Sequence, residues 1–147
     1  MSDKLILGNL EACELPELGI CDLHVRVDTG ARTSSLHVDN IKRFKRGGRS
    51  WVRFDIHPNA HNVEEVTRAE APLHAVRRVK SSNGQTERRR VIQTEFRIGE
   101  HSWPIEISLT DRSDMSYLML LGREAMGDRV LIDPSATFLA SEDVEAD

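Results

Sequence analysis

The sequence predicts a mostly β fold with little helix, on three observations. Apolar and polar residues alternate with a period of two through most of the chain, hairpin-type turn signals interrupt that alternation, and helical character is confined to short segments. The 147 residues show no internal repeat and no linker. We therefore expect a single domain over residues 1–147, with a disordered acidic tail at residues 141–147.

The expected elements follow from local patterns. A Gly-Gly turn centres a predicted β-hairpin over residues 36–57, and Asn83-Gly84, a strong hairpin signal, centres a longer one over residues 74–95. The polar residues 58–70 between them are expected to form a loop or a short helix. A short helical turn at residues 123–127 ends at a glycine. Further strands are predicted at residues 23–27, 102–109, 117–121 and 130–134.

Composition and charge weigh against several classes of function. An aromatic content of 5% and a net charge of −4 make nucleic-acid binding unlikely, and no apolar run is long enough for a membrane span. Because no signal-peptide pattern is present, we expect a cytoplasmic protein. The net charge conceals two basic clusters, either of which could be a solvated strand face. They are Lys42, Arg43, Lys45, Arg46, Arg49 and Arg53, and then Arg77, Arg78, Lys80, Arg88, Arg89 and Arg90.

The tetrapeptide Asp28-Thr29-Gly30-Ala31, at the end of an apolar alternating strand, is the strongest functional signal. A carboxylate on a strand-to-turn junction can activate water when a second carboxylate lies beside it. Two close carboxylates share one proton, so one accepts a proton from water while the other protonates the carbonyl oxygen of a substrate. The chain carries the motif once, which predicts a homodimer in which two copies of Asp28 meet.

The residues around Asp28 have expected roles of their own. Thr29 offers a hydroxyl that can hydrogen-bond across the dimer axis, and Gly30 allows the backbone to approach a substrate closely. Asp-Thr-Gly is also a common turn tripeptide, so a purely structural turn is the alternative. Ser34 and Ser35 lack the context of a nucleophile elbow and are expected to order the loop through hydrogen bonds.

Two stretches carry a family resemblance. Val27-Asp28-Thr29-Gly30-Ala31, together with Leu120-Leu121-Gly122-Arg123, resembles the retropepsin-like aspartic proteases. The longer pattern from Leu15 to Ile20 and from Val27 to His37 is similar to a bacterial family often labelled "ATP-dependent zinc protease". That family includes the RimB partner of RimK-type glutamate ligases. The resemblance covers residues 15–134, the expected core of the domain.

The resemblance implies a closed antiparallel barrel of the retropepsin type, with one short C-terminal helix and a twofold homodimer. It implies an aspartic peptidase whose catalytic residues are Asp28, Thr29 and Gly30, covered by a flap over residues 77–92. Leu120, Leu121, Gly122 and Arg123 would form a psi-shaped strand that crosses behind the catalytic loop and leads into the helix. RimB-type proteins are linked to trimming glutamate tails from a ribosomal protein, which implies an acidic or polyglutamylated substrate.

Charge placement supports the same class of substrate. Arg32 follows the motif at a position where viral members of the resembled family carry an aspartate, and basic residues gather on the expected flap. Guanidinium groups bind carboxylates bidentately, so an acidic peptide would be attracted to such a cleft. The alternative is that the flap residues face outward. The expected substrate-binding residues are Ala31, Arg32, Arg78, Lys80, Asn83, Gly84 and Arg88.

No metal or cofactor site is predicted. None of the six histidines has the spacing of a zinc site, and the phosphate-binding P-loop motif is absent. Any link to ATP would therefore come through a partner such as a RimK-type ligase. The alternative to a peptidase is a non-catalytic binding module that regulates such a ligase and holds glutamate tails on its basic surface.

Overall fold

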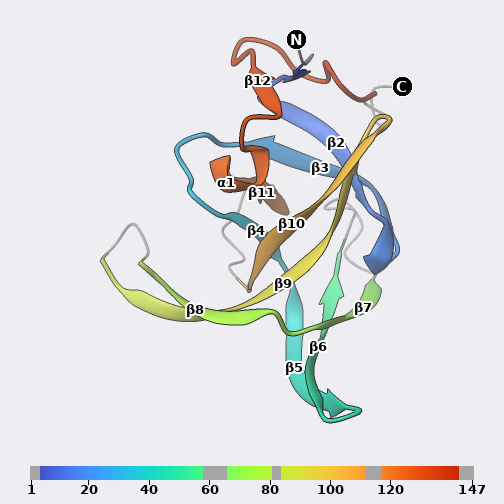
Figure 1. Cartoon of the computed structure of the whole chain (residues 1–147), viewed down its shortest axis with the longest axis vertical. Coiled ribbons are helices and arrows are strands. Elements are labelled where there is room, and N and C mark those ends of the chain that lie inside the picture. Colours follow the sequence, from blue (N-terminus) through green and yellow to red (C-terminus); the bar gives the residue numbers. More distant parts are fainter. Residues whose placement is uncertain (1–3, 58–65, 81–83, 112–116, 143–147) are drawn as a thin grey trace.

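The computed structural model describes residues 4–57, 66–80, 84–111 and 117–142 (Figure 1). No helix in these ranges has the length and hydropathy needed to span a membrane. The elements are β1 (Leu5–Leu7), β2 (Leu10–Leu15), the 3-10 turn η1 (Pro16–Leu18), β3 (Ile20–Val27), β4 (Ser34–His37), β5 (Asp39–Arg46), β6 (Arg49–Ile56), β7 (Thr67–Pro72), β8 (Ala75–Lys80), β9 (Thr86–Ile98), β10 (His101–Thr110), β11 (Met119–Leu121), α1 (Arg123–Met126) and β12 (Val130–Ile132).

Six strands close into a barrel in the order β10-β4-β11-β3-β2-β9, because β9 also pairs with β10. The predicted mostly β fold, with a closed barrel and one short helix, is confirmed. Most pairs are antiparallel, whereas β4–β10 and β3–β11 are parallel. Alternate residues fill the interior, as a period of two requires: Leu23 and Val25 of β3 and Ile105 and Ile107 of β10 are buried.

A second sheet, β5-β6-β7, extends from one end of the barrel (Figure 1). The predicted hairpin around the Gly-Gly turn is β5–β6. It begins at Asp39 rather than residue 36, because Ser34–His37 pairs with β10 and β11 as a barrel strand. One face of the sheet, which includes Phe54 and Val52, is buried in the core.

The prediction of a loop or helix over residues 58–70 was wrong from residue 67 onward. There β7 begins and pairs with β6 along its full length. Ala69 and Ala71 supply its buried face, and such small residues give a weak alternation signal within a polar segment. Residues 58–65 lie outside the described part of the chain.

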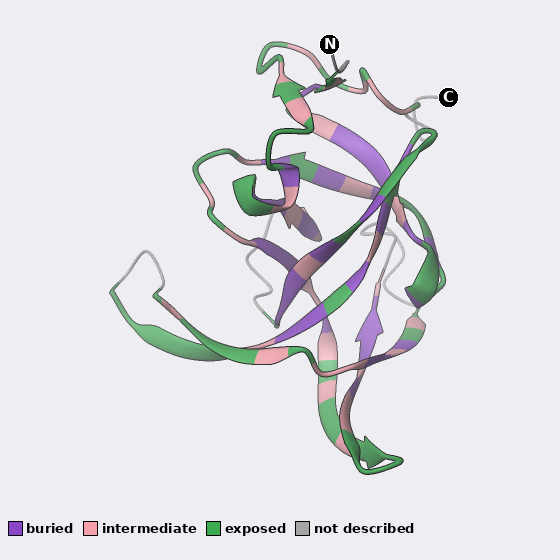
Figure 2. Ribbon diagram, viewed as in Figure 1, coloured by how far each residue is buried: buried purple, intermediate pink, exposed green. Residues whose placement is uncertain are grey.

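The predicted second hairpin is confirmed as β8–β9, which reaches out on the same side as the β3–β4 connection (Figure 1). β9 has thirteen residues; its second half belongs to the barrel and its first half to the hairpin. Figure 2 shows exposed residues concentrated on this hairpin and at the tip of β5–β6. Gly84 near the turn has a φ of 85°, in the left-handed region, whereas Asn83 lies outside the described residues.

β1 and β2 have no counterpart among the predicted strands. β1 pairs in parallel with β12, and β2 pairs with β3 and β9, so both ends of the chain lie at one end of the molecule (Figure 1). Glu11 of β2 is fully buried. Its carboxylate accepts hydrogen bonds from the N–H groups of Gly8, Leu139 and Ala140 and from the hydroxyl of Ser141. Ser141, where the tail was expected to begin, is thus attached to the barrel; residues 143–147 lie outside the description.

Candidate active site

The connection between β3 and β4 carries the Asp28 motif and is held from behind by β11. β11 lies between these two strands, parallel to β3 and antiparallel to β4. This is the psi-shaped crossing that the resemblance implied for Leu120 and Leu121. The Asp28 N–H donates to the carbonyl of Leu121 at 3.0 Å, so the motif begins on a buried strand and not on a free loop.

The Asp28 carboxylate is half-buried and only partly satisfied. Its Oδ1 accepts a hydrogen bond from the Gly30 N–H at 2.9 Å, and its carbonyl accepts one from the Ala31 N–H. Among the described residues, nothing donates to Oδ2. Thr29 and Gly30 are exposed beside it. One carboxylate oxygen is therefore fixed and the other is open to water or to a group from outside the chain.

The residues that follow β11 hold the Asp28 loop in place through backbone hydrogen bonds. The N–H groups of Arg123 and Glu124 donate to the carbonyls of Ala31 and Arg32, at 2.9 and 3.1 Å. The Arg123 guanidinium donates to the carbonyl of Thr29 at 3.3 Å. These bonds keep the shape of the loop rigid, which is the condition for two carboxylates to meet reproducibly.

Gly122, directly after β11, allows the backbone of that segment to contact the β3–β4 connection. Its N–H donates to Oγ of Ser34 at 3.0 Å, so the expectation that Ser34 orders the loop by hydrogen bonding is confirmed. A Cβ atom built on Gly122 would lie 2.5 Å from the carbonyl carbon and oxygen of Thr33. Only glycine fits at this contact.

A groove runs along β8 and reaches Arg32 and Thr33 at the end of the β3–β4 connection, whereas Asp28 is not among its lining residues. It consists of a hollow of about 310 Å³ and a neighbouring one of about 480 Å³, which share several lining residues. We call the two together the β8 groove. Three of the residues expected to bind substrate, Arg32, Arg78 and Lys80, line the groove. Lining residues that the sequence analysis did not single out for this role include Thr33, Arg77, Val79, Trp103, Glu106 and Glu124.

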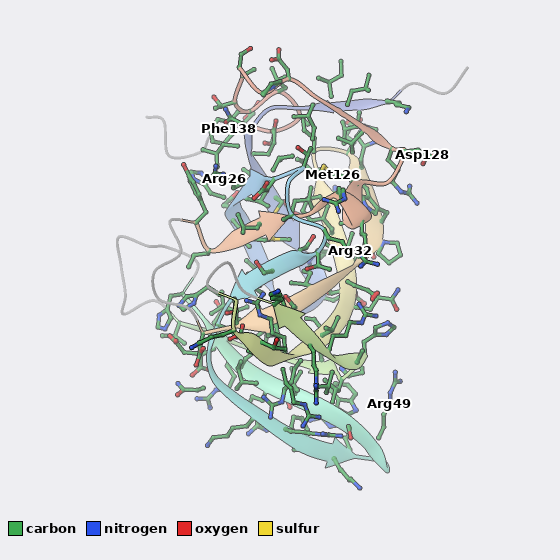
Figure 3. All side chains as sticks on the ribbon, turned by 90° about the vertical axis from the view of Figure 1, so that its left-hand side faces the viewer. Arg26, Arg32, Arg49, Met126, Asp128 and Phe138 are labelled. Atoms are coloured by element: carbon green, nitrogen blue, oxygen red, sulfur yellow. The ribbon has the colours of Figure 1, made fainter. Side chains whose placement is uncertain are left out.

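The basic residues of the β8 groove are partly neutralised by two carboxylates. Nε of Arg32 lies 2.5 Å from Oε1 of Glu124, and the Arg77 guanidinium lies 2.6 Å from Oε1 of Glu106. Glu124 therefore balances the charge of Arg32 beside the motif. Within the described residues, Arg78 and Lys80 form no ion pair, so the groove retains an excess of positive charge. Arg32 lies beside the loop in Figure 3 and its side chain is 75% exposed.

The remaining predicted binding residues lie elsewhere. Arg88 is directly opposite Arg78 in the hairpin and is exposed, but it is absent from the groove lining. Ala31 is half-buried and acts through its backbone, whereas Gly84 is exposed near the hairpin turn. Glu106 could have been found from the sequence, because it alternates with buried Ile105 and Ile107 and must point outward. No group of three or more potential metal ligands gathers among the described residues.

Comparison with known proteins agrees with this geometry. The family model of the retropepsin-like aspartic endopeptidase RimB matches residues 6–143. The chain belongs to this RimB-like family. A crystal structure of a Legionella pneumophila protein of unknown function resembles the RimB-like chain with a TM-score of 0.79 at 28% identity, covering 95% of this chain and all of that one.

Curated relatives of this RimB-like chain carry a different name. A protein from Shewanella halifaxensis (strain HAW-EB4) is 46% identical over the whole of this chain and is called "Probable alpha-L-glutamate ligase". A protein of the same name from Parasynechococcus marenigrum (strain WH8102) is 47% identical over 93% of the chain. The RimB-like chain spans only about a third of their length, 33% and 29% respectively.

Proposed function

We propose that this RimB-like protein is an aspartic peptidase that acts as a homodimer and cleaves acidic, glutamate-tailed peptides. The observation that carries the proposal is the state of Asp28. Its backbone is locked to β11 and one carboxylate oxygen is held by Gly30, while no described residue donates to the other oxygen. A second Asp28, from a partner copy, would complete the pair that this chemistry needs.

The reaction follows from the paired carboxylates. One ionised Asp28 takes a proton from water, and the hydroxide formed attacks the carbonyl carbon of the scissile amide. The protonated Asp28 of the other copy donates its proton to the carbonyl oxygen, giving a neutral tetrahedral intermediate. As the C–N bond breaks, the leaving nitrogen takes the proton held by the first Asp28, and one hydroxyl of the intermediate gives its proton to the second, now ionised Asp28, which leaves the new carboxylic acid.

The charge of the β8 groove supports the class of substrate. Arg78 and Lys80 have no ion-pair partner among the described residues, and glutamate side chains of a substrate can supply one. The names of the curated relatives point in the same direction, because a ligase that adds glutamate and a hydrolase that removes it handle the same product.

The same names favour a second candidate, a non-catalytic module attached to or associated with a glutamate ligase. The relatives are about three times as long as this chain and are named for ligation, so their matching segment need not hydrolyse anything. In that case the β8 groove would hold a glutamate tail and Asp28 would be a structural residue.

Mass spectrometry of a peptide ending in several glutamates, incubated with wild type or with Asp28→Asn, separates these two functions. We expect wild type to shorten the tail and Asp28→Asn to lose about 10³-fold in rate, because it removes the general base. Asp22→Asn is the matched control: this aspartate is exposed, with a φ of 57° that asparagine tolerates, and should leave the rate unchanged. Persistent cleavage by Asp28→Asn would refute the aspartic mechanism. Binding without cleavage by wild type would support the module.

A further inference from the structure

The outer face of the β5–β6–β7 sheet is a surface to which the Asp28 chemistry assigns no role. The strand register places Lys42, Phe44 and Arg46 of β5 beside Arg53, Trp51 and Arg49 of β6 on one face. The opposite face of the sheet supplies buried core residues, so this face points away from the core. Figure 3 shows Arg49 at the tip of the hairpin, well separated along the long axis from Arg32 beside the loop.

Aromatic rings and guanidinium groups are stacked on this face. The rings of Phe44 and Trp51 lie side by side with centroids 6.3 Å apart. The Arg46 guanidinium lies 4.5 Å from the Trp51 centroid and 5.2 Å from that of Phe44, and Arg53 lies 5.1 Å from Phe44. Stacking on a ring orients a guanidinium while leaving its N–H edge free to bind an anion.

Glu70 of β7 demonstrates which anion this geometry accepts. Its Oε2 lies 3.0 Å from the Arg46 guanidinium and 3.5 Å from that of Arg53, so one carboxylate lies between two stacked arginines. Around this triad the face holds more positive than negative charge, since Lys42 and Arg49 add cations. Arg68 and Asp55, farther along the sheet, form a pair of their own.

We propose that the outer face of the β5–β6–β7 sheet is a docking surface for an extended, acidic polypeptide segment. In an extended chain every second side chain points to the same side at a spacing of about 7 Å, the same as the spacing of Lys42, Phe44 and Arg46 along β5. Carboxylates on such a segment meet the guanidinium groups that are stacked on the two rings. The choice of a glutamate-rich occupant rests on the proposed function; the surface itself does not.

A protein segment fits better than single-stranded nucleic acid. Bases bind such platforms by stacking on open aromatic faces. Here guanidinium groups already cover Phe44 and Trp51, and the internal ligand of those guanidiniums is a carboxylate.

Binding of a fluorescent deca-glutamate peptide, measured by anisotropy, tests the proposal. All proteins carry Asp28→Asn to prevent turnover, and Arg78→Gln with Lys80→Gln to weaken the β8 groove. Adding Arg46→Gln and Arg53→Gln should raise the dissociation constant about tenfold or more, because two charge-assisted contacts are lost. Arg26→Gln with Arg97→Gln, two exposed arginines on barrel strands, removes the same charge and should change it less than twofold.

Two further measurements complete the test. Arg49→Gln, at the exposed tip, should weaken binding without any risk to folding. Equal weakening in the barrel-strand control, or tighter binding of a single-stranded RNA of the same length through Arg46 and Arg53, would overturn the proposal. Cleavage by the protein with Asp28 intact is assayed in parallel. If it never cleaves yet the peptide binds through Arg46 and Arg53, the peptidase proposal fails and this one stands.

Discussion

Gly122 shows how a single missing side chain can decide the shape of the candidate active site. Because a Cβ atom there would lie 2.5 Å from the Thr33 carbonyl, Gly122→Ala must push β11 and the Asp28 loop apart. We expect the free energy of unfolding to fall by about 1–3 kcal/mol. The rate of peptide cleavage per folded molecule should fall as well, because the Asp28 loop is displaced.

Gly8→Ala is the matched control for that change. A Cβ atom on Gly8 would lie 2.4 Å from the carbonyl oxygen of Ala136, a comparable clash at the other end of the molecule. It should lower stability in thermal unfolding but leave the cleavage rate of the folded fraction intact. If both variants lose the same activity, the Gly122 contact has no special part in shaping the loop.

Asp55 makes the stability of the second sheet depend on pH. Hydrogen bonds from Asn40 and from Arg68 hold the pKa of this carboxyl below its ordinary value of 3.8. A lowered folded-state pKa stabilises the fold at pH values above the unfolded-state pKa, and the contribution is lost as the pH falls below it. Denaturant unfolding should therefore show a steeper loss of stability below about pH 4 in wild type than in Asp55→Asn. Parallel curves for the two proteins would contradict this.

The β8–β9 hairpin offers a test of selectivity, because two facing arginines differ in their surroundings. Arg78 lines the β8 groove and Arg88, paired opposite to it, does not. Arg78→Gln should raise KM for a glutamate-tailed peptide about tenfold, since one charge-assisted contact is lost, and should leave an uncharged peptide unaffected. Arg88→Gln removes the same charge from the same hairpin and should alter KM less than twofold. An equal effect of both would indicate long-range attraction rather than contact in the groove.

Elements with strong local signals were predictable from the sequence, and elements that depend on distant partners were not. The β8–β9 hairpin followed from Asn83-Gly84, and α1 from the residues before Gly127. In contrast, β7 buries only alanines on its inner side, and β1 is a three-residue strand that exists through its pairing with β12. Such segments gain their structure from the sheet they join, which local periodicity does not record.

The candidate site also contains features that the sequence indicates and features that it does not. The motif residues and the cations of β8 could be proposed as site residues from residue type and spacing. The pairing of Arg32 with Glu124 could not be predicted, because it joins two residues that only the crossing of β11 brings together. Arg88 does not line the groove although it shares a hairpin face with Arg78, because the groove follows β8 and not β9, which the sequence does not say.

The whole molecule contains one Asp28, so the peptidase proposal requires two molecules. Mixing wild type with Asp28→Asn provides a direct measurement. If dimers form at random, an equal mixture contains only about a quarter of fully wild-type dimers, and activity per total protein should fall to about a quarter. A monomeric enzyme would retain about half, in proportion to its wild-type content, and that result would contradict the dimer. The two proteins are unfolded and refolded together so that subunits assort at random, and Asp22→Asn in place of Asp28→Asn controls for activity lost in this treatment.

The buried carboxylate of Glu11 has a consequence for biosynthesis. Three of its four hydrogen-bond donors come from Leu139, Ala140 and Ser141, which lie 128, 129 and 130 residues after Glu11 in the chain. Until those three residues have been synthesised, closing the barrel would bury an ionisable group without its partners, which is strongly unfavourable. The barrel therefore closes only after residues 139–141 have been synthesised.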